Sequence, residues 1–122
     1  MTLVGISLPD LKKKHGFSEK IQKLAVGCYL SFAIKALNAI RELYEAGCLD
    51  RDINEGNFAI TLADMRRISL LDFSMCRRCK DKEGIRLPRR SVAFRGSVGY
   101  APLSYHTSRE HYRKDDLECC IY

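Results

Sequence analysis

The sequence predicts a mainly α fold with a small β-hairpin, contained in a single domain. Three observations lead to this prediction. There is one long run of apolar residues at helical spacing, there are two short apolar runs separated by a polar turn, and a later stretch is rich in turn residues and has no sustained period.

The beginning of the chain is predicted to be extended and then helical. Residues 1–6 alternate weakly between apolar and small residues, which is typical of a strand end or an extended linker. A short helix is expected next, because Ser7 precedes a proline, Pro9, in the first turn. Gly16 is expected to end this helix.

One long amphipathic helix is predicted over residues 18–46. Ser18 is a suitable N-cap, and Gly47 stands where a glycine commonly follows the last helical turn. The residues between them that carry the helical apolar spacing are Ile21, Leu24, Ala25, Cys28, Phe32, Ala36, Leu37, Ile40, Leu43 and Tyr44.

The remaining elements are shorter. Polar residues predict a loop over 48–57, and the apolar runs 58–62 and 68–71 predict the two strands of the hairpin. Residues 74–100 predict a long irregular segment, which inside a compact domain usually serves a function. The last predicted element is the start of a helix at residues 115–122.

Length and composition limit the class of protein. The 122 residues, 46% of them apolar and 30% charged, fit one globular domain and do not fit a disordered chain. No apolar run is long enough to span a membrane, and the first residues lack the basic and apolar regions of a signal peptide. The six cysteines are therefore expected to be thiols, and the expected location is cytoplasmic or nuclear.

The positive charge is concentrated in one segment. Residues 76–95 hold eight basic and two acidic side chains, a net charge of +6, which equals the net charge of the whole chain. Such a segment can face an acidic protein, phosphate groups or nucleic acid, or it can simply be solvated. Few aromatic side chains lie among these basic residues, which disfavours nucleic acid as the partner.

Two polar motifs stand in a fixed order along the chain. Asp52 and Asn57 lie five residues apart in the loop that follows the long helix. The hairpin comes next, and Asp72-Phe73-Ser74 stands at its end. This order resembles the protein-kinase catalytic loop, H-R-D-L-x-x-x-N, followed by D-F-G.

The resemblance extends to the casein kinase I family, and within it to the tau-tubulin kinase branch. Residues 1–11 resemble that family's hinge and following helix, and the segments that resemble the tau-tubulin branch are 57–60, 71–77 and 94–102. Residues 113–118 resemble the start of the family's central helix. The resemblance covers nearly the whole chain but less than half of a kinase domain, so it implies a partial C-lobe without the N-lobe.

The resemblance divides the chain into the parts of a kinase domain. Residues 1–122 would form one partial domain, in which residues 18–46 are the long helix. The other expected parts are a hinge at 1–6, a catalytic loop at 50–57, an activation segment at 72–102 and a truncated helix at 115–122.

The resemblance implies roles for individual residues in phosphoryl transfer from ATP. Asp52 falls on the base that orients the substrate hydroxyl, and Asn57 and Asp72 fall on the two residues that hold Mg²⁺. Carboxylate and amide oxygens are suitable ligands for this hard cation. Asp116 falls on the helix residue that anchors the backbone of the catalytic loop.

The same resemblance implies contacts with the adenine of ATP. Met1 falls on the gatekeeper position, and Leu3 and Val4 fall on the hinge whose backbone meets adenine. Ala59 falls on the floor of the adenine pocket. The implied substrates are proteins that are phosphorylated on serine or threonine.

The chain departs from the family pattern at several positions. Asp50 replaces the histidine of the catalytic-loop motif, Asn54 replaces a lysine that neutralises phosphate, and Ser74 replaces the last glycine of D-F-G. Gly99 replaces an arginine that helps the family bind acidic or phosphorylated substrates. A carboxylate at position 50 is costly unless it is solvated or paired.

The sequence also lacks the parts that cover ATP. It contains no G-x-G-x-x-G motif, and Lys35 of Phe32-Ala33-Ile34-Lys35 lies within the predicted helix, so it is a poor match for the ATP lysine. Each lost element commonly lowers the rate by about 10²–10³. The chain by itself is therefore expected to be inactive.

Three alternatives remain open from the sequence. The chain can be a pseudokinase remnant that binds acidic protein partners through residues 76–95. It can be an incomplete product of a longer gene. A zinc site is a weaker possibility, because Cys76-x-x-Cys79 is a lone pair and Cys119-Cys120 lacks ligand spacing.

Overall fold

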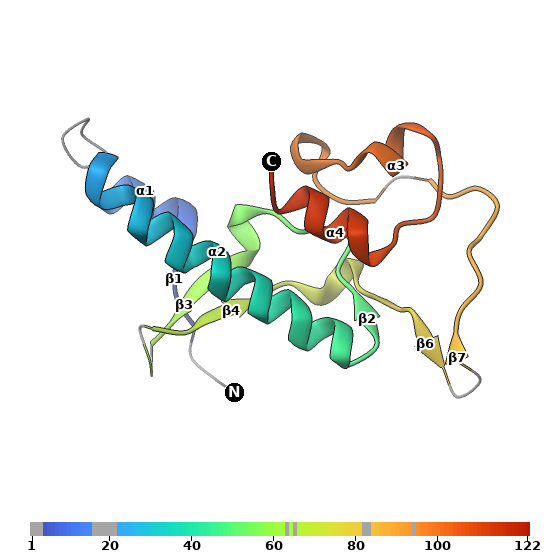
Figure 1. Cartoon of the computed structure of the whole chain (residues 1–122), viewed down its shortest axis with the longest axis horizontal. Coiled ribbons are helices and arrows are strands. Elements are labelled where there is room, and N and C mark those ends of the chain that lie inside the picture. Colours follow the sequence, from blue (N-terminus) through green and yellow to red (C-terminus); the bar gives the residue numbers. More distant parts are fainter. Residues whose placement is uncertain (1–3, 16–21, 63, 65, 82–83, 94) are drawn as a thin grey trace. The chain divides into compact units, whose positions relative to one another are not determined.

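The structure is a computed structural model, and it describes residues 4–15, 22–62, 64, 66–81, 84–93 and 95–122. The chain forms two compact units. Figure 1 labels the helices and strands that they contain. The first unit comprises Met1–Ile40 and Glu55–Leu71, and the second comprises Arg41–Asn54 and Asp72–Tyr122.

The first unit contains a three-stranded antiparallel sheet. Its strands are β1 (Val4–Ser7), β3 (Phe58–Thr61) and β4 (Ile68–Leu70), in the order β1-β3-β4. The predicted hairpin is confirmed, with Phe58 opposite Leu70 in register. Its central strand is well buried, because Phe58 and Ala59 are only 3% and 2% exposed.

Helix α1 (Leu8–His15) follows β1 directly. The hydroxyl of Ser7 accepts a hydrogen bond from the backbone N–H of Asp10 at 3.4 Å and donates one to the Asp10 carboxylate at 2.7 Å. This exchange caps the helix at Ser7. The sequence predicts the helix here from Pro9 in its first turn but leaves Ser7 and Leu8 open as the residue that precedes it. The predicted stop at Gly16 lies outside the described residues.

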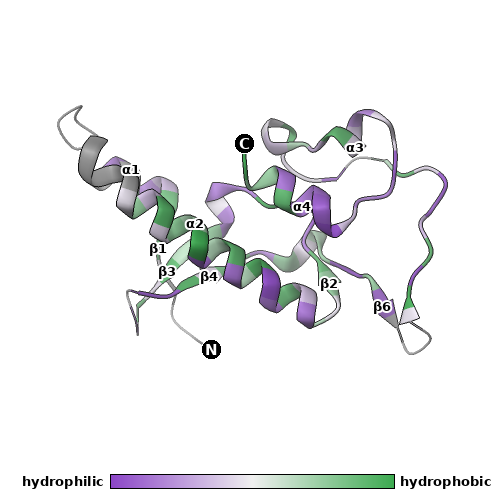
Figure 2. Ribbon diagram, in the orientation of Figure 1, coloured by the Kyte–Doolittle hydropathy of each residue, from purple (hydrophilic) through white to green (hydrophobic). Residues whose placement is uncertain are grey.

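The predicted long helix is α2 (Gln22–Glu45), and its predicted start at Ser18 lies outside the described residues. Its end agrees with the prediction, because Gly47 has a positive φ of 78° and its N–H donates to the Tyr44 carbonyl at 3.0 Å. The buried stripe is narrower than the apolar pattern predicts. Ala36 and Ile40 are buried, whereas Leu37 is 46% exposed. Figure 2 shows α2 apolar in its middle and hydrophilic towards Glu45.

The second unit contains short strands that the sequence does not predict. β2 (Cys48–Leu49) pairs with β5 (Arg77–Arg78), and β6 (Lys80–Asp81) pairs with β7 (Gly84–Ile85). The prediction of one irregular stretch over 74–100 is therefore wrong in part, because a strand of two residues is too short to produce a period in the sequence. The fold is accordingly a mixture of helices and small antiparallel sheets, with more strand than the predicted mainly α class.

Several short helical turns interrupt the irregular parts of the chain. Three are 3₁₀ turns, namely η2 (Glu55–Asn57) in the first unit and η3 (Phe73–Met75) and η4 (Val98–Tyr100) in the second. The short helix α3 (Leu103–His106) follows η4.

Helix α4 (Arg113–Cys119) corresponds to the helix predicted at residues 115–122. It begins earlier than predicted, because the backbone N–H of Tyr112 donates to the Asp115 carboxylate at 2.6 Å and makes Tyr112 the N-cap. The Tyr44 hydroxyl donates to the Arg113 carbonyl at 2.8 Å, which ties the end of α2 to the start of α4 within the second unit. Among the described residues, no helix is long and apolar enough to cross a membrane.

Candidate active site

The backbone at the start of loop 50–57 is held by one buried carboxylate. Asp116 on α4 is fully buried, and it accepts hydrogen bonds from the N–H groups of Asp50 at 3.0 Å and Arg51 at 2.9 Å. Arg51 has a positive φ of 73°, so the loop turns sharply here. The anchoring contact that the resemblance implies for Asp116 is thus present.

Asp116 has a further partner that sequence reasoning missed. His111 Nε2 lies 2.7 Å from Asp116 Oδ1, and only 14% of the His111 side chain is exposed. Burial and the nearby Asp116 carboxylate raise the pKa of Tyr44. No spacing rule links His111 to Asp116, since the two meet only where the chain turns into α4.

Asp52, the expected base, lies against segment 72–102. Its Oδ1 accepts a hydrogen bond from the backbone N–H of Ser97 at 2.6 Å. The close approach requires a glycine at position 96, because a Cβ on Gly96 would lie 2.6 Å from the Arg51 carbonyl oxygen. The Asn54 amide donates to the Asp52 carbonyl at 2.9 Å and to the Ser97 hydroxyl at 3.5 Å. Asn54 therefore fixes the loop, in the place of the family's lysine.

Asp50 is buried with one oxygen unpaired. Its Oδ1 accepts a hydrogen bond from the Asp52 N–H at 3.2 Å, while its Oδ2 has no partner in the described part of the chain. The pKa of Asp50 is raised to about 7. Burial is the main cause, the hydrogen bond from the Asp52 N–H opposes it, and the neighbouring carboxylates of Asp116, Asp52 and Asp72 add smaller increases. The histidine position of the family motif thus holds an acid that is partly neutral near pH 7.

Asp72 is an exposed carboxylate on a strained backbone. It has a φ of 54° and a ψ of 75°, an unusual conformation for a residue other than glycine. Its Oδ1 accepts a hydrogen bond from the Ser74 N–H at 3.1 Å, and hydrogen bonds from Ser74 lower the pKa of Asp72. Ser74 therefore supports this ionised carboxylate. An exposed, ionised carboxylate oxygen is the kind of ligand that a hard cation such as Mg²⁺ prefers.

The remaining predicted site residues belong to the first unit or lie outside the described residues. Asn57 ends η2, and its backbone carbonyl accepts the Leu71 N–H at 2.7 Å. Val4 lies in β1, and Ala59 in β3 is 2% exposed, which leaves little of its side chain for a ligand. Met1 and Leu3 are outside the described residues. The second unit thus brings together Asp50, Asp52, Asp72 and Asp116.

Two basic residues of segment 76–95 are neutralised within the protein. Glu110 is 6% exposed, and its carboxylate accepts hydrogen bonds from Arg89 Nε at 2.7 Å and Nη2 at 2.9 Å. Arg77 forms an ion pair with the same carboxylate. The hydrogen bonds from Arg89 are the main cause that holds the pKa of Glu110 well below its usual range. Sequence reasoning missed Glu110, which is distant in sequence from both arginines.

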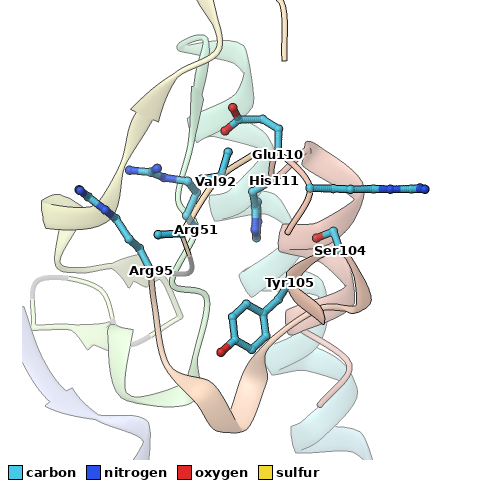
Figure 3. A pocket seen from close by; sticks show the side chains of 9 residues that line it. Arg51, Val92, Arg95, Ser104, Tyr105, Glu110 and His111 are labelled. Carbon is cyan, nitrogen blue, oxygen red and sulfur yellow. The ribbon is translucent and has the colours of Figure 1, made fainter. Parts of the chain in front are cut away.

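A small cavity of about 30 Å³ opens beside this network (Figure 3). Its lining includes three arginines and the histidine that pairs with Asp116. A cavity of this size holds about one water molecule. These basic lining residues are Arg51, Arg95, Arg109 and His111. The cavity therefore has a positive rim.

The cysteines of the structure are free thiols. Cys76 is half-buried, and burial is the main cause that raises the pKa of its thiol to about 12, which makes it a poor nucleophile. Among the described residues, no group of three or more His, Cys, Asp or Glu side chains is placed to hold a metal ion. The zinc alternative thus gains no support from the described part of the chain.

The chain is similar along its whole length to serine/threonine protein kinases. It is 32% identical to a Dictyostelium discoideum protein named as a probable serine/threonine-protein kinase, and it covers 24% of that protein. It is 31% identical to the serine/threonine-protein kinase spe-6 of Caenorhabditis elegans, of which it covers 32%. It is 26% identical to casein kinase 1-like protein HD16 of Oryza sativa subsp. japonica, of which it covers 17%.

These similarities give the chain a distant relation to serine/threonine protein kinases, including casein kinase I-like proteins. The chain spans about a quarter to a third of the length of the first curated relatives that it matches. It therefore corresponds to part of a kinase domain. No protein-family model matches the chain.

Proposed function

We propose that the chain is the part of a casein kinase I-like serine/threonine protein kinase, of the tau-tubulin branch, that carries the catalytic loop and the activation segment in the C-lobe. The observation that carries the proposal is the double hydrogen bond from the Asp50 and Arg51 amides to Asp116. A buried carboxylate that accepts two successive amides fixes the loop that presents Asp52.

Asp52 is the base in this proposal. Phosphoryl transfer is catalysed mainly by positioning and by stabilisation of charge, so the base must be held before the substrate arrives. The Ser97 N–H holds one oxygen of Asp52 at 2.6 Å. The carboxylate would accept the proton of a serine or threonine hydroxyl of a protein substrate as the γ-phosphoryl group of ATP is transferred to that oxygen.

Asp72 and Asn57 are the proposed ligands of Mg²⁺. The ion would neutralise the charge on the phosphates of ATP. Asp72 presents an ionised, exposed carboxylate, which suits this role. Asn57 would supply an amide oxygen, and Val4 and Ala59 would meet the adenine, together with Met1 and Leu3.

The 122 residues are proposed to be inactive alone. They contain neither a glycine-rich loop nor an ATP lysine, so transfer would require those groups from elsewhere. Binding of Mg·ATP is therefore the appropriate test, because it does not require turnover.

The test measures the melting temperature of the chain with and without millimolar Mg·ATP. We expect Mg·ATP to raise the melting temperature, because a ligand that binds only the folded state stabilises it. The rise should disappear in Asp72→Asn and when EDTA removes the magnesium. The matched control is Asp64→Asn, which removes an exposed carboxylate from the turn that joins β3 and β4.

The outcome decides whether the chain has the proposed metal and nucleotide site. A rise that Asp64→Asn retains and Asp72→Asn loses supports the proposed metal and nucleotide site. No rise in the parent chain, or an equal rise in Asp72→Asn, contradicts it.

A pseudokinase remnant that binds acidic proteins is the second candidate, and the exposed arginines favour it. Arg78, Arg90 and Arg95 are exposed, and Arg95 also lines the positive cavity. The internal pairing of Arg77 and Arg89 with Glu110 reduces the number of cations available to a partner. The proposed docking surface is therefore narrower than the whole of residues 76–95.

This second candidate predicts binding of an acidic peptide that weakens with added salt. Arg90→Ala and Arg78→Ala should each weaken that binding without unfolding the chain, because both side chains are exposed. Arg66→Ala, in the turn between β3 and β4, is the control for a general charge effect. Equal losses in all three variants, or no salt dependence, would contradict a defined docking surface.

A further inference from the structure

Asp50 combines complete burial with an incomplete set of hydrogen bonds. Its side chain is 0% exposed, one oxygen accepts the Asp52 N–H at 3.2 Å, and the other has no partner within the described residues. A buried ionised carboxylate normally has several donors. The site therefore suits a neutral carboxylic acid better than a carboxylate.

The charged groups around Asp50 make its ionisation still less favourable. Asp116 faces it from α4, Asp52 from its own loop, and Asp72 from the residue before η3, and all three are acidic. The Cys76 thiol also lies close enough for the charge of Asp50 to affect it.

Within the described residues, no hydrogen bond or ion pair joins a cation to Asp50 itself. The Arg51 Nε donates to the Met75 carbonyl at 2.7 Å, and His111 pairs with Asp116, the member of the cluster on α4. No hydrogen bond or ion pair joins Asp50 to Asp72 in the described part of the chain.

We propose that Asp50 is a positioning residue that makes the order of the catalytic loop depend on a single proton. With the proton bound, Asp50 stays buried, its Oδ1 holds the Asp52 amide, and the Asp50 and Arg51 amides remain on Asp116. Loss of the proton places a second negative charge beside Asp116 without a matching donor. The loop then opens to hydrate the carboxylate, and Asp52 loses its fixed position.

This inference rests on the proposed function, because it gives Asp50 a role towards the proposed base. Its chemistry requires only a proton and the chain itself. A test without nucleotide or metal can therefore fail while the proposed function holds, or succeed while the proposed function fails.

The test is hydrogen exchange of the Asp50 and Arg51 amides, followed by NMR from pH 5 to pH 8. If opening releases the Asp50 proton, the protection factors of both amides fall by about tenfold per pH unit as the pH rises towards 7, and they level off above it. The fall is measured after correction for the intrinsic base-catalysed rate. Protection that stays constant from pH 5 to pH 8 overturns the proposal.

Two variants identify the responsible group. Asp50→Asn keeps an acceptor for the Asp52 amide but has no proton to lose, so its protection factors should not depend on pH in this range. His111→Gln should retain the fall, although histidines also titrate in this range. A fall that persists in Asp50→Asn, or disappears in His111→Gln, overturns the proposal.

A matched control and a second measurement complete the design. Glu42→Gln removes an exposed carboxylate of α2 and should leave the fall unchanged. If Asp50→Asn does not fold, the titration of Asp50 is followed in the parent chain instead, by the change of its carboxyl ¹³C chemical shift with pH. A midpoint within one unit of pH 7 supports the proposal, and a midpoint below pH 5 overturns it.

Discussion

Replacement of Glu110 with glutamine tests whether the internal ion network holds segment 72–102 in place. Glu110 accepts hydrogen bonds from the Arg89 backbone N–H at 3.1 Å and from two nitrogens of its guanidinium, and it also pairs with Arg77. Glu110→Gln keeps the size of the side chain. It removes the charge and turns one acceptor oxygen into an NH₂ donor that faces arginine.

The expected loss follows from the burial of the partners. Removal of one partner from a fully buried ion pair costs about 3–5 kcal/mol, whereas an exposed pair contributes about 0–1 kcal/mol. Glu110 is 6% exposed but the Arg89 side chain is 49% exposed, so the network lies between these limits. We expect a loss of about 2 kcal/mol, which corresponds to a fall in melting temperature of about 8 °C for a chain of this length.

The assay is urea denaturation at several pH values, with melting temperature as a second measure. The pKa of Glu110 is lower in the folded chain than its usual value near 4.5, so its ionisation stabilises the fold above that pH. This stabilisation is lost as the pH falls below about 4.5 and the carboxylate gains a proton. The difference between the parent chain and Glu110→Gln should therefore be constant from pH 6 to pH 8 and shrink in acid.

Glu45→Gln is the control, because Glu45 pairs with Arg41 at 3.6 Å on the surface of α2 and both side chains are at least 67% exposed. It should change the free energy of unfolding by less than about 0.5 kcal/mol. A loss in Glu110→Gln as small as that of the control, or a loss that grows in acid, would refute the reasoning.

One further substitution tests the backbone at position 96, and a thiol reagent tests the protection of Cys76. Gly96→Ala should lower the free energy of unfolding by about 3 kcal/mol in urea denaturation, because φ is 123° and the new Cβ would lie 2.6 Å from a carbonyl oxygen. Gly99→Ala is its control, since no atom lies within 4 Å of the added Cβ, and equal losses would contradict the argument. A thiol reagent at pH 8 should label the exposed Cys28 quickly and Cys76 only after unfolding, because burial raises the pKa of Cys76 to about 12. Similar labelling rates, followed by mass spectrometry, would show that Cys76 is not protected.

Local patterns predicted the regular elements. The hairpin and the end of α2 at Gly47 follow from apolar spacing and from glycine geometry, both of which act over a few residues. The start of α4 was misplaced, because its cap is a contact between Tyr112 and Asp115, and tyrosine is not among the side chains that ordinarily signal an N-cap. The two-residue strands were not predicted, because they are too short to show an alternating pattern of apolar and polar residues.

The candidate site was only partly visible in the sequence. Motif order placed Asp52 in the loop after the long helix and Asp72 at the end of the hairpin. The family resemblance implied that Asp116 anchors the loop backbone, a contact that is present at 2.9–3.0 Å. The sequence did not predict the hydrogen bond from the Ser97 N–H to Asp52. That bond depends on the close approach of Gly96 to the Arg51 carbonyl oxygen.

The sequence by itself determined where the ionisable residues stand and where the long helix and the hairpin form, because these properties depend on residue type and near neighbours. Only the tertiary structure decided which residues surround each charged group. It brought Glu110 to Arg77 and Arg89, and it buried Asp50 among other acids. The reason is physical: the ionisation and strength of a charged group depend on its burial and its partners, and those are set by residues far away in the chain.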